Sequence, residues 1–505
     1  MALAVFNTLG NRKEPFVPLT PGKVKMYVCG VTVYDLCHIG HARANVAFDV
    51  IVRYLRHRGY VVTFVRNFTD VDDKIIRKAE KEGVKPDEIA ERYIRAFYED
   101  FDRMGLLRPD QEPRATKHIG QIVDLVRRLV AAGKAYAVDG DVYYSVKGVR
   151  EYGKLSGKNT DDLLVGARVD VDERKRDPLD FALWKSSKPG EPSWESPWGP
   201  GRPGWHIECS AMAMAHLGET FDIHGGGKDL VFPHHENEIA QSEGATGKTF
   251  ARYWIHNGFV NVDNEKMSKS LGNFFTLREV LKTVHPEALR FFFATSHYRS
   301  PIDYSDRNLA EAKAGLNRLY EVKRKKEAFE KAGIAATSLP PGEGFAPLLE
   351  AKARFEKAMD DDFNTAGALG HLFDAMRALN RLAPADPAAE REKAGQFLEG
   401  FAILEPLFGV LGLLQTSATE YFQVAYEHVG EPSKKFAARS DIAFTPGFPA
   451  EARLNETEIL RRIEERNAAR ARKDFAEADR IRKELDAQGV LLEDSKAGTT
   501  WKYKT

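Results

Sequence analysis

The first hundred residues alternate between short apolar runs and a longer amphipathic stretch. Residues 24–29 and 61–65 are apolar runs of strand length. Between them, apolar side chains recur at helical spacing over residues 41–58, and Gly59 follows where this helix is expected to end. A strand, a helix and a second strand in this order predict a parallel sheet covered by helices, so we expect the α/β fold class.

The hydrophobic pattern changes after residue 107. Residues 118–132 predict a helix, and residues 135–146, with Tyr and Val around Gly140, predict a small β-rich piece. Residues 186–203 contain five prolines and are predicted to form a loop. Because α/β character resumes near residue 205, we interpret residues 107–204 as an insertion into the α/β domain.

From residue 306 onward the pattern is helical as far as residue 414, with a Pro/Gly-rich interruption at residues 338–344. Residues 415–455 lack clear periodicity and are predicted to be a linker, whereas residues 457–488 predict one last basic helical stretch. The resulting division of the chain is 1–106 and 205–255 for the two halves of the α/β domain, 107–204 for the insertion, 256–310 for a connecting segment, 311–414 for a helical bundle, 415–455 for a linker and 456–505 for a C-terminal end.

Composition narrows the class of protein. A chain of 505 residues is expected to form several domains, and 43% hydrophobic with 29% charged residues is typical of a soluble globular protein. Equal numbers of basic and acidic residues, 74 of each, exclude a chain coated in positive charge. Three cysteines are too few for a disulfide scaffold. No signal-peptide pattern and no membrane-spanning run is visible, so we expect a cytoplasmic protein without a membrane partner.

Two short motifs carry candidate phosphate chemistry. Residues 38–41 read His-Ile-Gly-His where the first strand meets its helix, and helix N-termini favour phosphate. Gly40 would allow close approach, and His38 and His41 could donate hydrogen bonds, although two capping histidines explain the motif equally well. Residues 266–270 read Lys-Met-Ser-Lys-Ser, and Lys266 and Lys269 could close over a triphosphate. Such a run alone is more often a solvated loop, but chance rarely gives both motifs together.

The two motifs resemble the signature of class I aminoacyl-tRNA synthetases. Four further segments, residues 27–30, 69–74, 204–209 and 224–238, narrow the resemblance to the cysteinyl-tRNA synthetase family. The similarity covers residues 26–304 and returns at 471–501. It implies a Rossmann-type parallel-sheet catalytic domain with an insertion, a stem-contact segment that carries residues 266–270, a C-terminal α-helical bundle and a small anticodon-binding end.

Two of the three cysteines lie in the resembling segments, and they suggest a metal site. His234 and Glu238 are four residues apart, on one helical face, and with Cys29 and Cys209 they make a plausible zinc ligand set. Spacing alone favours a buried thiol and a surface His/Glu pair, because the ligands come from three distant segments. The resemblance matches all four residues to the family's ligands and implies one Zn²⁺ per chain. Cys37 does not match and is predicted to be a small core residue.

A zinc ion would explain how cysteine is distinguished from serine. A pocket that measures size alone gains only ~1–3 kcal/mol from such a small difference. Zinc binds a thiolate, whereas a serine hydroxyl stays protonated and binds poorly. Discrimination at binding would make an editing domain unnecessary, and residues 107–204 look too short to form one.

The resemblance also assigns substrate contacts. Thr69 and Trp205 match residues that close around bound cysteine, while a larger group is assigned to nucleotide binding: Gly30, Thr32, Gly40, His224, Gly226, Asp229 and Ser268. For the acidic run Asp70, Asp72 and Asp73, helix capping is as good an explanation as substrate contact.

Near the C-terminus, a helix rich in arginine is followed by segments that resemble the family's anticodon-binding end. Acidic residues are interleaved there, so a solvated helix face fits equally well. Phe475, where the family often has Trp, would stack on an unpaired base. The hydrogen-bonding groups for that base would be those of Asp479, Arg482 and Asp494.

Together these inferences predict a cysteine-activating ligase with L-cysteine, Mg²⁺-ATP and tRNA-Cys as partners, and we expect a monomer. The cysteine carboxylate would attack the α-phosphate to give cysteinyl-adenylate and pyrophosphate, aligned by the four catalytic candidates of the two motifs. The acyl group would then pass to the terminal ribose of the tRNA. Two alternatives are a ligase that joins cysteine to a small amine, as in mycothiol biosynthesis, and a catalytically dead RNA-binding paralogue.

Overall fold

The structure is a computed structural model of the 505-residue chain. It describes residues 2–147, 149, 151–158, 174–262, 265–266, 274–339, 346–427, 456–472, 474–488, 490–495 and 498–503. Ser268 and Lys269 lie outside these ranges, and for Lys266 and Asp494 only the backbone is described. Within these ranges, no helix has the length and apolar character needed to cross a membrane.

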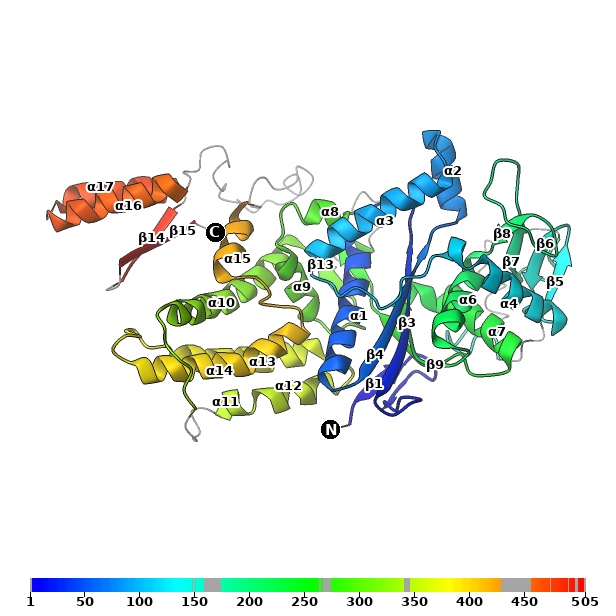
Figure 1. The fold of residues 1–505 in the computed structure, drawn as a ribbon, viewed down its shortest axis with the longest axis horizontal. Coiled ribbons are helices and arrows are strands. Elements are labelled where there is room, and N and C mark those ends of the chain that lie inside the picture. The colour runs from blue at the N-terminus through cyan, green and yellow to red at the C-terminus, as the bar shows by residue number, and fades with distance from the viewer. Residues whose placement is uncertain are drawn as a thin grey trace.

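A four-stranded parallel sheet forms the centre of the α/β part (Figure 1). Its order is β10 (Ala251–Asn257), β9 (Phe221–Gly227), β3 (Lys23–Thr32) and β4 (Val61–Thr69). The first strand, β3, therefore has β4 on one side and β9 on the other, so the strand order reverses beside it. The predicted α/β class with a parallel sheet is confirmed.

Helices cover both faces of this sheet, and the alternation of side chains along β3 explains why. Val24, Met26 and Val28 enter one apolar core together with α1 (Ile39–His57). Tyr27 points to the opposite face, into a second core with Cys209 of α6 (Trp205–Leu217). Side chains on both faces of the strand are therefore buried at residues 26–28, as expected for a strand inside a parallel sheet.

The insertion consists of η1 (Ala115–Lys117), α4 (Ile119–Ala131) and an antiparallel sheet. This sheet has the order β5 (Ala135–Val138), β6 (Asp141–Tyr144), β7 (Phe181–Ser186) and β8 (Gly201–Pro203). The prediction of a loop through residue 203 was wrong for β8, which pairs with β7 through Lys185 and Ser186. β8 is at the edge of this sheet, and an edge strand tolerates a proline such as Pro203.

Short elements connect the halves of the α/β part. At the N-terminus, β1 (Ala4–Asn7) pairs with β2 (Arg12–Pro15), and α2 (Asp73–Glu82) and α3 (Pro86–Arg103) follow β4. After β9 come η2 (Lys228–Leu230), η3 (Val231–His235) and α7 (Glu236–Thr246). A small sheet then has the order β12 (Glu265–Lys266), β11 (Val260–Val262) and β13 (Ile302–Tyr304), with α8 (Leu277–Val280) and α9 (Pro286–Ala294) between β12 and β13.

The C-terminal half is helical, as predicted. It contains α10 (Asp306–Lys331), α11 (Ala346–Leu349), α12 (Ala351–Met359), α13 (Thr365–Leu382), α14 (Arg391–Val410) and α15 (Ala418–Glu427). The last helix falls inside the predicted linker, so that prediction was wrong for residues 418–427. Its ordering comes from tertiary contacts, because the ring of Tyr421 stacks on Tyr320 of α10 at a centroid distance of 3.7 Å.

The C-terminal end contains α16 (Glu456–Ala471), α17 (Phe475–Ala487), β14 (Val490–Ser495) and β15 (Gly498–Tyr503). The prediction of one continuous helical stretch over residues 457–488 was wrong, because α16 ends at Ala471 and a second helix begins at Phe475. The Asp474 carboxylate accepts a hydrogen bond from the Glu477 N–H and thereby starts α17 as a new helix. The two helices pack on each other through a separate small core that includes Ile459, Ile481 and Leu485.

Candidate metal centre and active site

The predicted site residues gather at the carboxyl ends of the parallel strands. Cys29 lies near the end of β3, Thr69 is the last residue of β4, and His224 lies in the middle of β9. These three strands are neighbours where the strand order reverses. In open α/β sheets, ligands bind in the crevice at this point.

Gly30 explains how Cys29 is aimed. The pairing of β3 with β4 shifts register between Val28 and Val31, and such a bulge redirects a side chain. A Cβ atom on Gly30 would lie 1.6 Å from the Asn67 carbonyl oxygen, so only glycine fits here. The Gly30 N–H also donates to the Asn67 side-chain oxygen at 2.8 Å, which fixes the bulge.

Four candidate metal ligands converge from separate elements. The ligand atoms of Cys29, Cys209, His234 and Glu238 all lie within 4.8 Å of one another. Glu238 Oε1 is 3.3 Å from the Cys29 sulfur and 3.1 Å from His234 Nε2. Two sulfurs, one imidazole and one carboxylate are a donor set that zinc prefers, so the chemistry of the site fits this metal.

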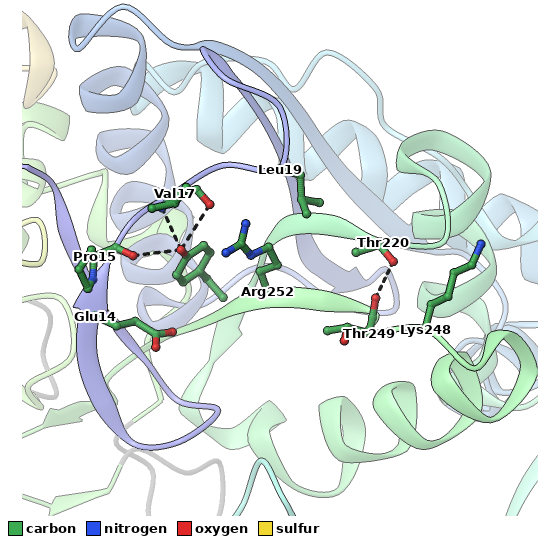
Figure 2. Close-up of a pocket in the computed structure, with 9 residues that line it drawn as sticks. Glu14, Pro15, Val17, Leu19, Thr220, Lys248, Thr249 and Arg252 are labelled. Atoms are coloured by element: carbon green, nitrogen blue, oxygen red, sulfur yellow. Dashed lines mark hydrogen bonds between the residues drawn. The ribbon is translucent and has the colours of Figure 1, made fainter.

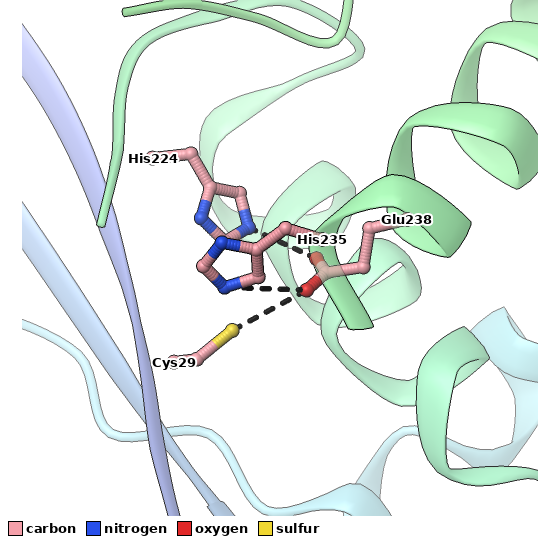
Figure 3. A group of neighbouring side chains, drawn as sticks. All are labelled: Cys29, His224, His235 and Glu238. Carbon is pink, nitrogen blue, oxygen red and sulfur yellow. Dashed lines mark hydrogen bonds and ion pairs between the residues drawn. The ribbon is translucent and has the colours of Figure 1, made fainter. Parts of the chain in front are cut away.

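A second group shares two of these ligands. Cys29, His224, His235 and Glu238 also lie within 4.8 Å of one another, and Figure 3 shows both rings turned toward the Glu238 carboxylate. His224 Nε2 is 2.9 Å from Glu238 Oε2. In the described part of the chain, the buried Nε2 of His235 has no hydrogen-bond partner. This nitrogen is therefore a further candidate metal ligand in the cluster.

The charges of the cluster suit a cation. Burial alone would raise the pKa of Glu238, but His224 and His234 beside it lower that pKa to about 2. The pKa of Cys209 is lowered to about 6, first by a hydrogen bond from the Cys29 thiol and further by His234. Burial opposes the charged form of His234, yet the neighbouring Glu238 raises its pKa to about 10. These shifts favour the deprotonated forms of Cys209 and Glu238, which are the forms that bind a metal.

Aromatic rings surround the predicted ligands. The indole of Trp205, 38% exposed, stacks on His234 at a centroid distance of 4.2 Å. His206 Nδ1 lies 3.0 Å from His234 Nδ1. His206 and His235 were not predicted to belong to this cluster, although each is adjacent to a predicted site residue, Trp205 or His234. Imidazoles next to two predicted site residues were the signal that could have found them.

His224 has a different environment from the one expected of a nucleotide contact. Its side chain is fully buried, and its ring stacks on Trp254 at 4.3 Å with an angle of 14°. Since its Nε2 contacts Glu238, it is placed to orient a predicted metal ligand. Gly226 lies close by, and a Cβ there would come within 2.8 Å of the His235 ring. Asp229 is exposed on η2.

The motif at residues 38–41 starts α1. His38 is the N-cap, its Nδ1 accepts from the Gly40 N–H, and His41 Nδ1 accepts from the His38 N–H. The two rings stack at 3.7 Å. Burial, followed by the charge of His38, holds the pKa of His41 well below its usual value, so that this ring is neutral and its Nε2 carries the proton.

Phe274 and Phe275, which follow the lysine segment in the sequence, lie beside this motif. The ring of Phe274 lies 5.2 Å from that of His38, and the Ile39 N–H donates to the Phe275 carbonyl. Lys266 ends β12, which pairs with β11. The described residues on the C-terminal side of the Lys269 segment are thus attached directly to the start of α1.

The remaining predicted residues lie elsewhere. Asp72 caps α2 by accepting from the Lys74 N–H at 2.8 Å, and Asp70 accepts from the Thr116 hydroxyl at 2.6 Å. Phe475 is 63% exposed at the start of α17. Asp479 and Arg482 are also exposed on this helix, and Asp494 lies in β14.

A separate hollow of about 870 Å³ lies away from the predicted site (Figure 2). It is lined by Thr220, Lys248 and Thr249, which precede β9 and β10. The hollow is therefore at the amino ends of these strands, opposite the crevice. Tyr253 also lines the hollow; its hydroxyl donates to the Pro15 carbonyl and accepts from the Val17 N–H, so this ring holds the N-terminal segment on the sheet.

Comparison with known proteins agrees with this geometry. The family model described as "tRNA synthetases class I (C) catalytic domain" matches residues 15–314, and a DALR domain model matches residues 354–415. A structure of Mycobacterium tuberculosis methionyl-tRNA synthetase with methionyl-adenylate has the same fold, with a TM-score of 0.60 and 17% identity over 85% of this chain and 99% of that one. The chain belongs to the class I aminoacyl-tRNA synthetases.

Closer relatives identify the branch within this class. Proteins named Cysteine--tRNA ligase from Geobacter sulfurreducens and Trichlorobacter lovleyi are 57% and 56% identical to the chain, with 100% of each chain covered. The chain therefore belongs to the cysteine--tRNA ligase family, as its motifs indicated.

Proposed function

We propose that this protein charges tRNA-Cys with L-cysteine in two steps, the first of which consumes ATP. The observation that carries the proposal is the cluster of Cys29, Cys209, His234 and Glu238, of which all but Cys29 are buried, at the same edge of the sheet as the start of α1. A thiol-selecting site and a phosphate-binding helix terminus are thereby combined in one crevice.

The four cluster residues would hold one Zn²⁺. When bound, this ion supplies a ligand position that accepts the sulfur of cysteine as thiolate and rejects the hydroxyl of serine. His224 supports this arrangement through its contact with Glu238 Oε2, since a neighbouring imidazole fixes the orientation of a ligating carboxylate. Trp205, stacked on His234, and Thr69 would enclose the rest of the amino acid.

Adenylate formation needs alignment and charge stabilisation. The cysteine carboxylate is already ionised at neutral pH, so it attacks the α-phosphorus without a protein base. The new carboxylate–phosphorus bond replaces the bond to pyrophosphate, which leaves with Mg²⁺. His38 and His41 would donate to the phosphates, and Lys266 and Lys269 would neutralise the charge that develops on the leaving group.

The nucleotide is expected to lie along the ends of β3 and β9. Gly30, Thr32, Gly40, Gly226, Asp229 and Ser268 remain our assignments for its contacts. At the far end of the chain, the exposed Phe475 ring would stack on an anticodon base, with Asp479, Arg482 and Asp494 beside it.

Cysteine-dependent exchange of pyrophosphate into ATP tests the first step. If Lys269 acts on the transition state, Lys269→Ala will depress kcat for exchange far more than it raises KM for cysteine. An effect mainly on KM would contradict this role. Purified protein that folds and binds zinc but shows no exchange would contradict the proposed function itself.

A further inference from the structure

Arg43 is a buried cation on the helix that carries His38 and His41, and the proposed chemistry does not use it. It lies two residues after His41, so its side chain leaves α1 on the opposite face. Only 2% of Arg43 is exposed. Its guanidinium donates to the carbonyl of Phe259 at 2.5 Å, and to further carbonyls in the segment 297–300: His297 at 3.4 Å, Tyr298 at 3.3 Å and Ser300.

These carbonyls lie in the two segments that directly precede β11 and β13, the paired strands beside Lys266. Phe259 directly precedes β11, and its carbonyl also accepts from the N–H of Ile302, the first residue of β13. β11 pairs with β12, which ends at Lys266. One guanidinium therefore joins the helix of His38 and His41 to both strands that support the lysine segment.

The segments that precede β11 and β13 approach each other so closely that glycine is required at position 258. The Gly258 N–H donates to the Tyr298 carbonyl at 2.8 Å. A Cβ atom on Gly258 would lie 2.5 Å from the carbonyl oxygens of both Arg299 and Ser300. This backbone contact makes the pair of segments a stiff unit, and Arg43 is attached to its centre.

The contacts of Arg43 use the shape of arginine and not only its charge. Within the described part of the chain, its guanidinium forms no ion pair, and its partners are neutral carbonyls. Burial lowers its pKa to about 10, which still leaves it protonated at neutral pH. Burying a cation without a carboxylate is costly, and an apolar side chain would fill the same space without that cost. A planar fork of five donors is the group that can hold several carbonyls at fixed angles.

We propose that Arg43 is a positioning residue for adenylate formation, which holds the strands leading to Lys266 and Lys269 in register with His38 and His41. This inference rests on the function proposed above. A small displacement of one half of the phosphate site would misalign the reacting groups, and a shift of about 1 Å can cost 10²-fold in rate.

Loss of Arg43 need not unfold the segment 297–300, because Asp362 also holds it. Asp362 is fully buried and accepts from the Tyr298 hydroxyl at 2.8 Å and from Arg299 Nε at 2.6 Å. A conservative Arg43→Lys keeps the charge but replaces the fork by a single ammonium group. Its effect should therefore fall on alignment.

The test compares Arg43→Lys with Arg290→Lys in the zinc-loaded full chain. Arg290 is a matched control: it is 1% exposed, but it binds Asp49 and the carbonyls of Met104 and Leu411, away from the strands of Lys266. Three quantities are measured: Tm, cysteine affinity by calorimetry, and kcat of cysteine-dependent ATP–pyrophosphate exchange well below the lowest Tm.

We expect Arg43→Lys to lower kcat by about 10²-fold with cysteine affinity unchanged. We expect Arg290→Lys to lower Tm with kcat retained. The single-turnover rate of adenylate formation should also be measured in a Lys269→Ala background. There Arg43→Lys should lower this rate much less than it does in the parent protein, because both changes act through one segment. Retained kcat in Arg43→Lys, or an equal loss in both backgrounds, would overturn the inference. Absence of exchange by the parent protein would instead refute the proposed function.

Discussion

Cys209→Ser is the sharpest perturbation of the predicted metal centre. Cys209 is 2% exposed, so the change leaves packing almost unaltered while it replaces a thiolate by a hydroxyl that stays protonated. Zinc at structural protein sites binds with about 10–16 kcal/mol. Divided among four ligands, this is roughly 2.5–4 kcal/mol for each, and every 1.36 kcal/mol corresponds to a factor of ten. Zinc affinity should therefore fall by about 10²- to 10³-fold.

The assay is competition for zinc against a fluorescent chelator, at neutral pH and with the full chain. Cys37→Ser is the matched control, because Cys37 is also buried but packs in the apolar core beside α1, away from the cluster. We expect Cys37→Ser to bind zinc like the parent, with a somewhat lower Tm. Parent-like zinc affinity in Cys209→Ser, or loss of zinc in Cys37→Ser, would refute the assignment.

Two further predictions concern stability, measured by urea unfolding. Gly30→Ala should lower the free energy of unfolding by about 1–3 kcal/mol, because the new Cβ would overlap the Asn67 carbonyl. Gly120→Ala, with open space on α4, should raise it by up to about 1 kcal/mol. Equal effects of the two substitutions would contradict the close approach at Gly30. Arg290→Met should cost about 1–3 kcal/mol, because the buried Asp49 loses one of its two arginine partners and keeps only Arg53. Burial opposes ionisation of Asp49, but Arg290 lowers its pKa, so this loss should be full at neutral pH and shrink below about pH 4; a loss independent of pH would contradict it.

Local patterns were sufficient to predict the central elements. The helical periodicity over residues 41–58 corresponds to α1, and the apolar runs at 24–29 and 61–65 correspond to β3 and β4. The observed strands are longer at their carboxyl ends, where buried polar residues such as Asn67 and Thr69 interrupt the apolar pattern. Site residues break the rules that identify strands, so a pattern analysis ends the strand too early.

Other features depend on contacts that no local pattern contains. The break between α16 and α17 comes from one capping bond of Asp474, and α15 is held by the stacking of Tyr421 on Tyr320. The four candidate metal ligands could be selected only by family resemblance, because their convergence requires the sheet to bring three distant segments together. Arg43 carried no signal at all, since its partners are backbone carbonyls far away in the sequence.

The most direct test of the whole account is charging of total tRNA by the purified, zinc-loaded protein with ATP and either labelled cysteine or labelled serine. We predict acid-precipitable cysteine on the tRNA, no detectable serine, and loss of charging after the metal is removed by a chelator. Folded, zinc-loaded protein that attaches no cysteine to tRNA, or that attaches serine equally well, would contradict the account.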